Sequence, residues 1–390
     1  MSKKIIYLDN AATTKVDDAV LKEMLPYFKE KYGNASSLHS KGIEAEKALS
    51  EARKKVAGLL NCLPEEIIFT SCGSESNNFA LKGAAHALKE RGKHIISSKF
   101  EHPSVMNSLR ALEEDGFEVT YLNIDRNGFI DLNQLKKSVR KDTLLVSVML
   151  ANNEIGMIQP LKEVIEIVKQ KNPGTLVHSD AVQALGKLKI DLKGLGVDLM
   201  SFSGHKIHAP KGVALLFKKK GVALKPLIHG GEQENKLRAG TENIAFIAGF
   251  AKAIEVALNE RSENNKKMIK LRNKLIDGLL EKIPQSSLNG ARENRLPTIA
   301  SIAFPGAEGE SILLRLDALG ICVSTGSACS QKSLKPSHVL KALGLDALRV
   351  HGSIRFSLNK HSTEKEIDFV LDNLPGIIKE LREMSPAWRK

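Results

Sequence analysis

The 390-residue sequence lacks the features that mark membrane, secreted and repeat proteins. No apolar run approaches the about 20 residues that a transmembrane helix requires. The basic N-terminus MSKKIIYLDN is not followed by the apolar stretch and small-residue cleavage site of a secretory signal. Pro-rich linkers, low-complexity tracts and internal repeats are also missing. We therefore expect a cytoplasmic globular protein that has no membrane partner and is long enough for more than one domain.

Aromatic residues make up only 5% of the sequence, whereas basic residues are in excess and give a net charge of +13. Such a charge raises the possibility of nucleic-acid binding, because Lys and Arg neutralise phosphates. The basic residues are scattered in short groups, such as Lys218–Lys220, without interleaved aromatic residues. A basic solvated surface that can dock acidic partners explains this pattern better than specific nucleic-acid binding.

Cysteine is scarce too, with only Cys62, Cys72, Cys322 and Cys329 in the whole chain and no CxxC pair. Neither a disulfide framework nor a resident metal site is therefore expected. Cys62 and Cys322 lie within apolar runs, which predicts that both are small buried hydrophobic residues. Cys72 and Cys329 lie among Gly and Ser, where a thiol stays reachable.

From Ile67 to Lys219, short apolar runs rich in β-branched residues alternate with segments of helical periodicity. This alternation predicts an α/β fold with a mostly parallel sheet. The run TLLVSVML at 143–150 is almost entirely apolar, as expected for a strand covered on both faces. Upstream, a helix over 42–60 is predicted from apolar residues at helical spacing. They are Ala45, Leu49, Ala52, Val56 and Leu60.

Residues 245–283 read as one long helix that is interrupted by the polar run NERSENNKK. We expect the domain boundary in this run. The predicted large domain spans 14–258, and a smaller α+β domain combines 1–13 with 259–390. Functional sites in such folds lie at strand ends and domain junctions.

Three polar groups follow the predicted strands of the large domain. The segment TSCGSESNN leads from a strand through Gly73 and Ser74 into a helix, which suits a phosphate, although a simple Ser helix cap explains it equally well. Asp180 ends an apolar run, where a carboxylate is costly without a partner. Lys206 lies between two histidines and by itself could be a solvated loop cation. Together, a lysine, an acid and a phosphate site are what a pyridoxal phosphate enzyme needs.

Ten motifs in one order extend this reading over nearly the whole chain. They are YLDNAATT, YGNASSLH, TSCGSESNN, EHPSV, NNEIG, HSDAVQ, SFSGHKIHAPKG, RAGTEN, STGSACS and HGSIRFSLN. On these motifs the sequence resembles the cysteine desulfurases of the class V aminotransferase group, in the nitrogen-fixation and iron–sulfur-assembly branch with a long catalytic loop. The resemblance implies the fold type I of pyridoxal phosphate enzymes, a homodimer, and conversion of L-cysteine to L-alanine with sulfur held as a persulfide.

The resemblance also implies roles for individual residues around the cofactor. Lys206 would hold the cofactor through its amine, and Asp180 would pair with the ring nitrogen. His102 would stack on the ring and transfer protons. The other implied cofactor contacts are Gln183 and Asn153 on the phenolic oxygen side, Gly73, Ser74, Ser203 and His205 at the phosphate, and Thr241 at the phosphate of the other subunit.

For the substrate, the resemblance implies that Arg355 clamps the carboxylate, a task that suits the guanidinium fork. Asn10, Ala11 and Asn34 would line the substrate pocket. Cys329 would be the nucleophile, since a thiolate attacks the substrate sulfur and takes it as a persulfide.

The segment around 324–338, which contains Cys329, is expected to be a mobile loop that carries sulfur outward, because it has no apolar anchor between Thr325 and Lys332. An iron–sulfur scaffold protein or a tRNA-thiolation relay is the expected acceptor, and Cys329 is a candidate ligand during cluster handover. Two alternatives on the same fold stay open: a selenocysteine lyase, or an aminotransferase, which would not need Cys329. A basic RNA-binding or scaffold protein without catalysis is the alternative from another class.

Overall fold

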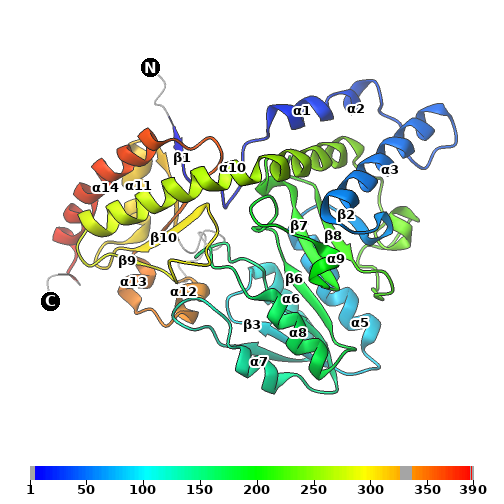
Figure 1. The fold of residues 1–390 in the computed structure, drawn as a ribbon, viewed down its shortest axis with the longest axis horizontal. Coiled ribbons are helices and arrows are strands. Elements are labelled where there is room, and N and C mark those ends of the chain that lie inside the picture. The colour runs from blue at the N-terminus through cyan, green and yellow to red at the C-terminus, as the bar shows by residue number, and fades with distance from the viewer. Residues whose placement is uncertain (1–4, 326–335, 387, 389–390) are drawn as a thin grey trace.

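The computed structural model describes residues 5–325, 336–386 and 388. The predicted nucleophile Cys329 and most of the predicted loop therefore lie outside the described residues. Within those ranges, the molecule has a large sheet at one end and a smaller sheet at the other, and one long helix connects them (Figure 1).

The large sheet has seven strands, and all of them run in one direction except β8, which is antiparallel to both neighbours. In order across the sheet they are β2 (Ile67–Thr70), β8 (Ala214–Lys218), β7 (Leu199–Ser203), β6 (Leu176–Asp180), β5 (Thr143–Ser147), β3 (His94–Ser98) and β4 (Glu118–Leu122). The predicted α/β fold with a mostly parallel sheet is confirmed. The sequence pattern did not single out β7, because Ser alternates with its apolar residues.

Helices cover both faces of this sheet. Ile95 and Ile96 are adjacent on β3 and must point to opposite faces. Ile95 packs in a cluster with helix α6, whereas Ile96 packs in another cluster with helix α8. The helices around the sheet are α3 (Ser40–Leu60), α4 (Gly73–Asn78), the π-helix η2 (Phe79–Gly83), α5 (Ala84–Leu88), α6 (Pro103–Glu114), α7 (Leu132–Ser138), α8 (Leu161–Lys171) and α9 (Leu192–Leu195), with short 3-10 turns η1 (Pro64–Glu66), η3 (Gly204–Lys206) and η4 (Gln233–Lys236).

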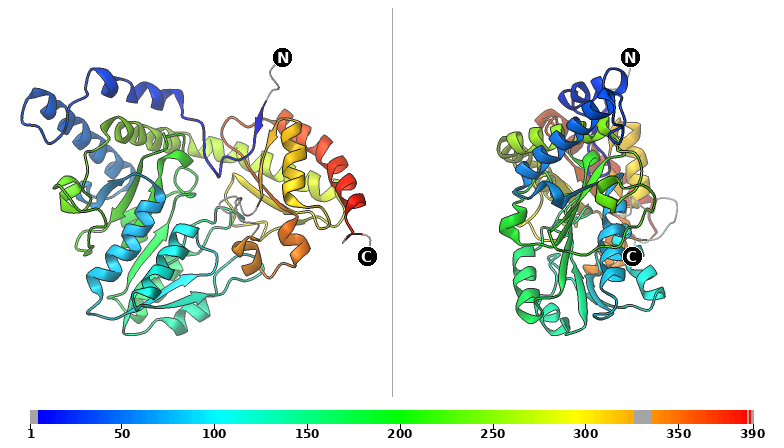
Figure 2. Two further views of the ribbon diagram at one scale, coloured as in Figure 1. Left: turned by 180° about the vertical axis from the view of Figure 1, so that it is seen from behind. Right: turned by 90° about the vertical axis from the view of Figure 1, so that its right-hand side faces the viewer.

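The predicted helix at 42–60 is α3, and the apolar stripe that predicted it is buried. With α1 (Asp18–Met24) and α2 (Pro26–Lys29), α3 forms an arm at the end of the molecule opposite the small sheet (Figure 2).

The long predicted helix is α10 (Ile244–Lys282), and it is continuous through the polar run. Its first half contributes Ile254 to the core of the large sheet, and its second half contributes Leu271 to the core of the small unit.

The small unit is a four-stranded antiparallel sheet beside a two-stranded parallel pair. Its strands are β12 (Ser324–Thr325), β13 (Ser353–Ser357), β10 (Ile299–Ala303) and β9 (Ser287–Leu288), with β1 (Ile6–Tyr7) paired to β11 (Ile321–Cys322). Its helices are α11 (Gly309–Ala318), α12 (His338–Ala342), α13 (Ala347–His351) and α14 (Glu364–Met384). Ile6 and Leu8 pack in this unit, whereas Val20 packs against the large one. This packing agrees with a chain that starts in the small unit; the exact domain limits stay a prediction.

The three described cysteines are free thiols. Cys62 and Cys322 are only half-buried, so the prediction that both are buried is correct only in part. Cys62 follows the C-terminal end of α3, and Cys322 lies on the short strand β11, which pairs with β1. One side of each residue is therefore exposed to solvent. Burial still raises the pKa of Cys62 to about 12, with a smaller contribution from the charge of Glu66, and this thiol is unreactive at neutral pH. Cys72 is exposed, as expected.

No helix in the described ranges is long and apolar enough to span a membrane.

Candidate active site

The candidate site forms where β6 and β7 end side by side. Asp180 is the last residue of β6, Ser203 is the last of β7, and Lys206 follows in η3. The two strands are parallel neighbours, with Asp180 in register with Ser201. Asp180, Ser203 and Lys206 therefore lie close together at the C-terminal ends of two neighbouring parallel strands, where sites in such sheets are found.

Asp180 is held as a buried carboxylate. Its Oδ2 accepts a hydrogen bond from Asn77 Nδ2 at 2.7 Å, and its Oδ1 accepts one from the backbone N–H of Val182 at 2.9 Å. The side chain is only 4% exposed, so both bonds are needed to offset the cost of burying the charge. Each oxygen retains a lone pair, and the carboxylate can accept one more bond from a protonated ring nitrogen.

A hydrogen-bond chain connects Asp180 to His102. Asn77 Nδ2 also donates to Ser104 Oγ at 2.9 Å, and Ser104 Oγ lies 2.8 Å from His102 Nδ1. The backbone N–H of Ser104 donates to the same Nδ1, which caps helix α6. Since Nδ1 is an acceptor, the neutral ring carries its proton on Nε2. Burial is the main cause that lowers the pKa of His102, the charge of Lys206 lowers it further, and the carboxylate of Asp180 opposes them. The imidazole is therefore neutral at neutral pH.

Lys206 meets the N-terminal segment that was predicted to line the substrate pocket. Its Nζ donates to the carbonyl oxygens of Ala11 and Ala12, each at 2.6 Å. Gln183 Nε2 donates to the same Ala11 oxygen at 2.9 Å. Asn10 is fixed by donation to Ser357 O at 2.8 Å, which ties this segment to the small unit. The structure thus brings the predicted residues Asn10, Ala11, Gln183 and Lys206 together.

The predicted phosphate site lies at the start of α4, close to the end of β7. A Cβ added to Gly73 would lie 2.9 Å from Val182 Cγ2, so the close approach of α4 to the sheet requires glycine there. Ser203 Oγ is buried and has no hydrogen-bond partner among the described residues, which leaves a hydroxyl donor for a phosphate oxygen. Ser74 is exposed in the first turn of α4, where helix N–H groups favour an anion.

His205 follows Ser203 by two residues, and its ring is neutral. Its Nδ1 lies 3.2 Å from Thr13 Oγ1. Burial, followed by the charges of Lys206, Lys211 and Lys187, lowers the pKa of His205 to about 4. The unpaired Ser203 hydroxyl, the glycine cradle, the buried acid and the lysine fit pyridoxal phosphate, which these residues would hold.

Arg355 lies on β13 at the junction of the two units and is 2% exposed. Its Nη1 donates to Asn153 O at 2.9 Å, and its Nη2 pairs with Asp9 Oδ1 at 2.9 Å. Its Nε is buried and has no partner among the described residues. A carboxylate can be held by such a guanidinium, because the hydrogen bonds already formed fix the plane of the fork.

Some predicted residues are not gathered at this site within one chain. Asn34 lies in the exposed turn between α2 and α3, where its Oδ1 accepts from Ser36 N. Thr241 is exposed just before α10. Their roles, and that of Cys329 outside the described residues, stay predictions. Asn77, Ser104 and Asp9 join the site without having been predicted individually, although each lies within a motif quoted above.

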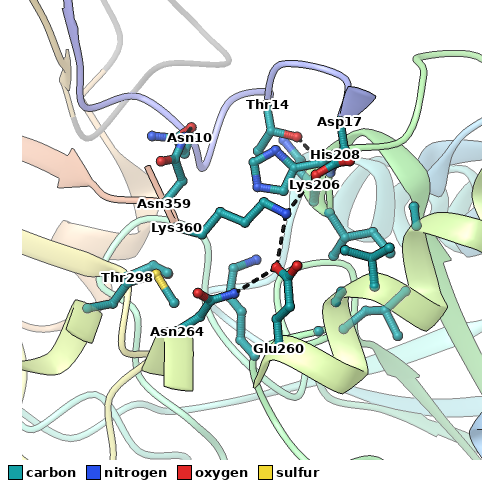
Figure 3. A pocket seen from close by; sticks show the side chains of 18 of the residues that line it. Asn10, Thr14, Asp17, Lys206, His208, Glu260, Asn264, Thr298, Asn359 and Lys360 are labelled. Carbon is teal, nitrogen blue, oxygen red and sulfur yellow. Dashed lines mark hydrogen bonds and ion pairs between the residues drawn. The ribbon is translucent and has the colours of Figure 1, made fainter. Parts of the chain in front are cut away.

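A cavity of about 60 Å³, lined by both apolar and charged side chains, adjoins Lys206 on the side of α10, between the two units (Figure 3). Its volume holds a few water molecules. Lys187 also lines it and donates to Gln183 O at 3.1 Å. Burial first, and then the charge of Lys206, lowers the pKa of Lys187 to about 7. Three lysines, Lys187, Lys206 and Lys360, therefore line this cavity, and of these Lys206 is next to His205 in the chain.

Lys360 crosses the same cavity and joins three segments (Figure 3). Its Nζ contacts Asp17 Oδ2 at 2.6 Å and Glu260 Oε2 at 3.0 Å, and Lys360 and Asp17 side chains are both 15% exposed. Burial alone would lower the pKa of Lys360, but the two carboxylates outweigh it and raise this pKa. Burial would likewise raise the pKa of Asp17, but its bonds to Lys360 and to Ala19 N lower it.

We expect Lys360→Met to lower the free energy of unfolding by about 1–3 kcal/mol, because two carboxylates lose their buried cation. Chemical denaturation near neutral pH measures this. The difference should shrink as the pH falls through the lowered pKa of Asp17 or rises through the raised pKa of Lys360. The matched control is Lys270→Met, since Lys270 is 73% exposed and its pair with Glu364 should contribute little. Equal losses in the two variants would contradict the role given to Lys360.

Comparison with known proteins agrees with this site. A family model described as aminotransferase class-V matches residues 6–370. The cysteine desulfurase IscS of Clostridium botulinum is 49% identical over 387 residues, which cover 99% of this chain and 97% of that protein. The protein of the same name from Dictyoglomus turgidum is 50% identical over 384 residues, covering 98% and 97%. A solved structure titled NifS-like protein has a TM-score of 0.92 and 45% identity, and covers 97% of this chain and 100% of that one.

The α/β fold with a lysine, an acid and an anion pocket at the ends of adjacent strands defines a pyridoxal phosphate-dependent enzyme. The chain belongs to the aminotransferase class-V family, and within that family to the cysteine desulfurases.

Proposed function

We propose that the enzyme removes sulfur from L-cysteine, releases L-alanine and holds the sulfur as a persulfide on Cys329. One observation carries this proposal beyond the family. Strand β12 pairs with β13 so that Ser324 is opposite Arg355. The segment that contains Cys329 therefore begins next to the guanidinium that would hold the substrate carboxylate. An aminotransferase has no use for a thiol at this point.

Each residue of the site has a task that follows from its position. Arg355 binds and orients the substrate carboxylate. Lys206 Nζ, at the edge of the substrate pocket, takes the proton from the substrate α carbon and returns one. His102 carries its proton on Nε2 and can pass it on, and Asn77 and Ser104 keep the ring in this tautomer. Bound pyridoxal phosphate supplies an electron sink for negative charge on the substrate carbons.

The overall transfer balances without an external oxidant. The Cys329 thiolate forms a new S–S bond with the substrate sulfur, and the substrate C–S bond breaks. Its electron pair stays on the β carbon, which gains a proton and becomes the methyl group of alanine. The β carbon is reduced and the transferred sulfur is oxidised, so L-cysteine and a thiol give L-alanine and a persulfide.

The products test the proposal. With added pyridoxal phosphate and a thiol reductant, the protein should form alanine and sulfide from L-cysteine in equal amounts. A keto acid product with an amino acceptor would instead identify an aminotransferase. A rate with selenocysteine that is retained when Cys329 is replaced, with no sulfide from cysteine, would identify a selenocysteine lyase.

We expect Arg355→Lys to raise KM for L-cysteine by about 10- to 100-fold, because lysine keeps the charge but loses the bidentate fork. The value of kcat should fall less, since the carboxylate is bound equally in the ground state and the transition state. Steady-state kinetics of alanine formation give both parameters. Arg315→Lys, on the exposed face of α11, is the control. An unchanged KM would show that Arg355 does not bind the substrate.

We further propose that the enzyme is a homodimer that pairs through the α1–α3 arm. The arm carries the large exposed apolar side chains Leu21, Leu25, Phe28, Tyr32, Leu38 and Ile43. An exposed apolar patch of this kind marks an interface. Pairing would also bring Thr241 to the partner's site, where the family resemblance places it. Light scattering should give the mass of two chains, and the mass of one chain would overturn this proposal.

The acceptor of the sulfur is proposed to be an iron–sulfur scaffold protein, with a tRNA-thiolation relay as the second candidate. The names of the relatives, IscS and NifS-like protein, support the first. A reducing compartment such as the cytoplasm suits the reaction, because Cys329 must stay a thiol between turnovers. Transfer of labelled sulfur from the loaded enzyme to each purified candidate distinguishes them.

A further inference from the structure

Ser337 makes two hydrogen bonds at the start of α12, two residues after the end of segment 326–335. Its Oγ accepts from the backbone N–H of Leu340 at 3.1 Å and so caps the helix. The same hydroxyl donates to Glu154 Oε2 at 2.5 Å. Ser337 is 5% exposed and Glu154 is 7% exposed, so water does not compete for this bond. The bond from Leu340 is sufficient to cap the helix. The bond to Glu154 is not part of the cap, and it connects α12 to the large unit.

Glu154 is placed for that purpose by a rigid turn of the large unit. Asn152 Oδ1 accepts from the backbone N–H groups of Glu154 and Ile155, at 2.8 and 2.9 Å. The preceding residue, Asn153, offers its carbonyl oxygen to Arg355. Burial raises the pKa of Glu154 to about 7, while the bond from Ser337 and the charge of Arg355 oppose this. Burying an apolar side chain at position 154 would cost less free energy of folding than burying this carboxyl group. The carboxyl group is therefore explained by the contact that it makes with Ser337 rather than by a gain in stability.

A second contact reinforces the first. The next residue, His338, places its Nε2 at 2.8 Å from the backbone oxygen of Glu101. Burial, with the charge of Arg110, lowers the pKa of His338, although its bond to Glu101 raises it, so the ring is a neutral donor. Glu101 directly precedes His102. The start of α12 is thus tied to two turns of the large unit, and each turn adjoins a residue of the site.

On the N-terminal side of this segment, Ser324 and Thr325 of β12 pair with β13 beside Arg355. We propose that the Ser337–Glu154 hydrogen bond is a positioning contact that holds the start of α12 against the large unit, so that Cys329 meets the substrate sulfur. The inference rests on the proposed role of Cys329. Ser337 and Glu154 act through Cys329 and are not themselves catalytic residues.

Two substitutions separate the positioning bond from the helix cap. Asp and Asn both cap helices as well as Ser. Ser337→Asn retains a donor toward Glu154, whereas Ser337→Asp places two carboxyl groups together, which repel each other once both are ionised at alkaline pH. In that range, single-turnover persulfide formation should be slowed by about 10- to 100-fold in Ser337→Asp and changed little in Ser337→Asn. Adding Glu154→Gln to Ser337→Asp should restore the rate, because the amide donates to the new carboxylate.

The spectral change of the bound cofactor on adding L-cysteine, with its apparent Kd, is the companion readout. Substrate binding uses Arg355 and Lys206, so this Kd should be unchanged in all variants, whereas a general structural defect would change it. Equal rates for Ser337→Asp and Ser337→Asn, or no restoration in the double variant, would overturn the proposal.

If Ser337→Asp does not fold, Ser337→Gly provides the same test. Glycine costs a helix cap only a few tenths of a kcal/mol and donates no side-chain bond. Slowed persulfide formation with an unchanged Kd is then expected, and a rate equal to that of the unchanged protein would contradict the inference. A failure of the proposed function is distinguishable, because a Cys329→Ser variant would then still release sulfide from L-cysteine.

Discussion

Cys329→Ser should abolish sulfide release from L-cysteine, with a loss of at least about 10³-fold in kcat. A serine hydroxyl is not ionised at neutral pH and cannot form the S–S bond that accepts the sulfur. The purified variant should nevertheless retain pyridoxal phosphate and change its absorption when L-cysteine is added, because Lys206, Asp180 and Arg355 are intact. Sulfide assays and absorption spectra measure the two halves of this expectation separately.

The matched control for this variant is Cys62→Ala. Cys62 is half-buried, its pKa is raised to about 12 by burial and by the charge of Glu66, and it lies just after α3. Its removal should leave sulfide release unchanged. Unchanged release in Cys329→Ser would show that another group accepts the sulfur and would refute the assignment of the nucleophile.

Lys206→Ala should lose both the covalent attachment of the cofactor and about 10³-fold or more of activity, because one amine serves as the anchor and as the proton carrier. The attachment can be located directly. Borohydride reduction of the loaded protein fixes the cofactor to its lysine, and digestion with mass spectrometry should find it on the peptide that contains Lys206.

Lys187 makes the test sharper, since its lowered pKa of about 7, set by burial and then by the charge of Lys206, would also suit an amine that bonds to an aldehyde. Lys187→Met removes this second amine from the same cavity. We expect the label to remain on Lys206 and the visible absorption to persist in this variant. A label on the Lys187 peptide would require a different orientation of the cofactor from the one implied by Ser203 and Asp180.

The fold could be predicted from the sequence where the hydrophobic pattern is regular. The stripe of α3 and the apolar run of β5 have a single periodicity, and both elements occur as expected. Strand β7 was missed as a separate strand because it alternates Ser with apolar residues, even though all five of its residues are buried. The half-buried state of Cys62 and Cys322 also could not be predicted, since the apolar neighbours in sequence do not show which side of a residue meets solvent.

The candidate site was predictable to the extent that its residues follow strands. Asp180 is the last residue of β6 and Lys206 follows β7 by three residues, and the parallel order of these strands brings them together. The supporting contacts were not predictable. The Asn77–Asp180 bond spans 103 positions and the Ser337–Glu154 bond spans 183, and no local pattern specifies such pairs. Polar residues in turns have many possible partners, and only the packing of the two units selects one.

The most direct test of the central claim is mass spectrometry of the loaded enzyme after a single turnover with L-cysteine in the absence of reductant. The account predicts that the peptide containing Cys329 gains the mass of one sulfur atom, in an amount equal to the alanine formed, and that peptides containing Cys62, Cys72 and Cys322 do not. Alanine formation without added sulfur on the Cys329 peptide would contradict it.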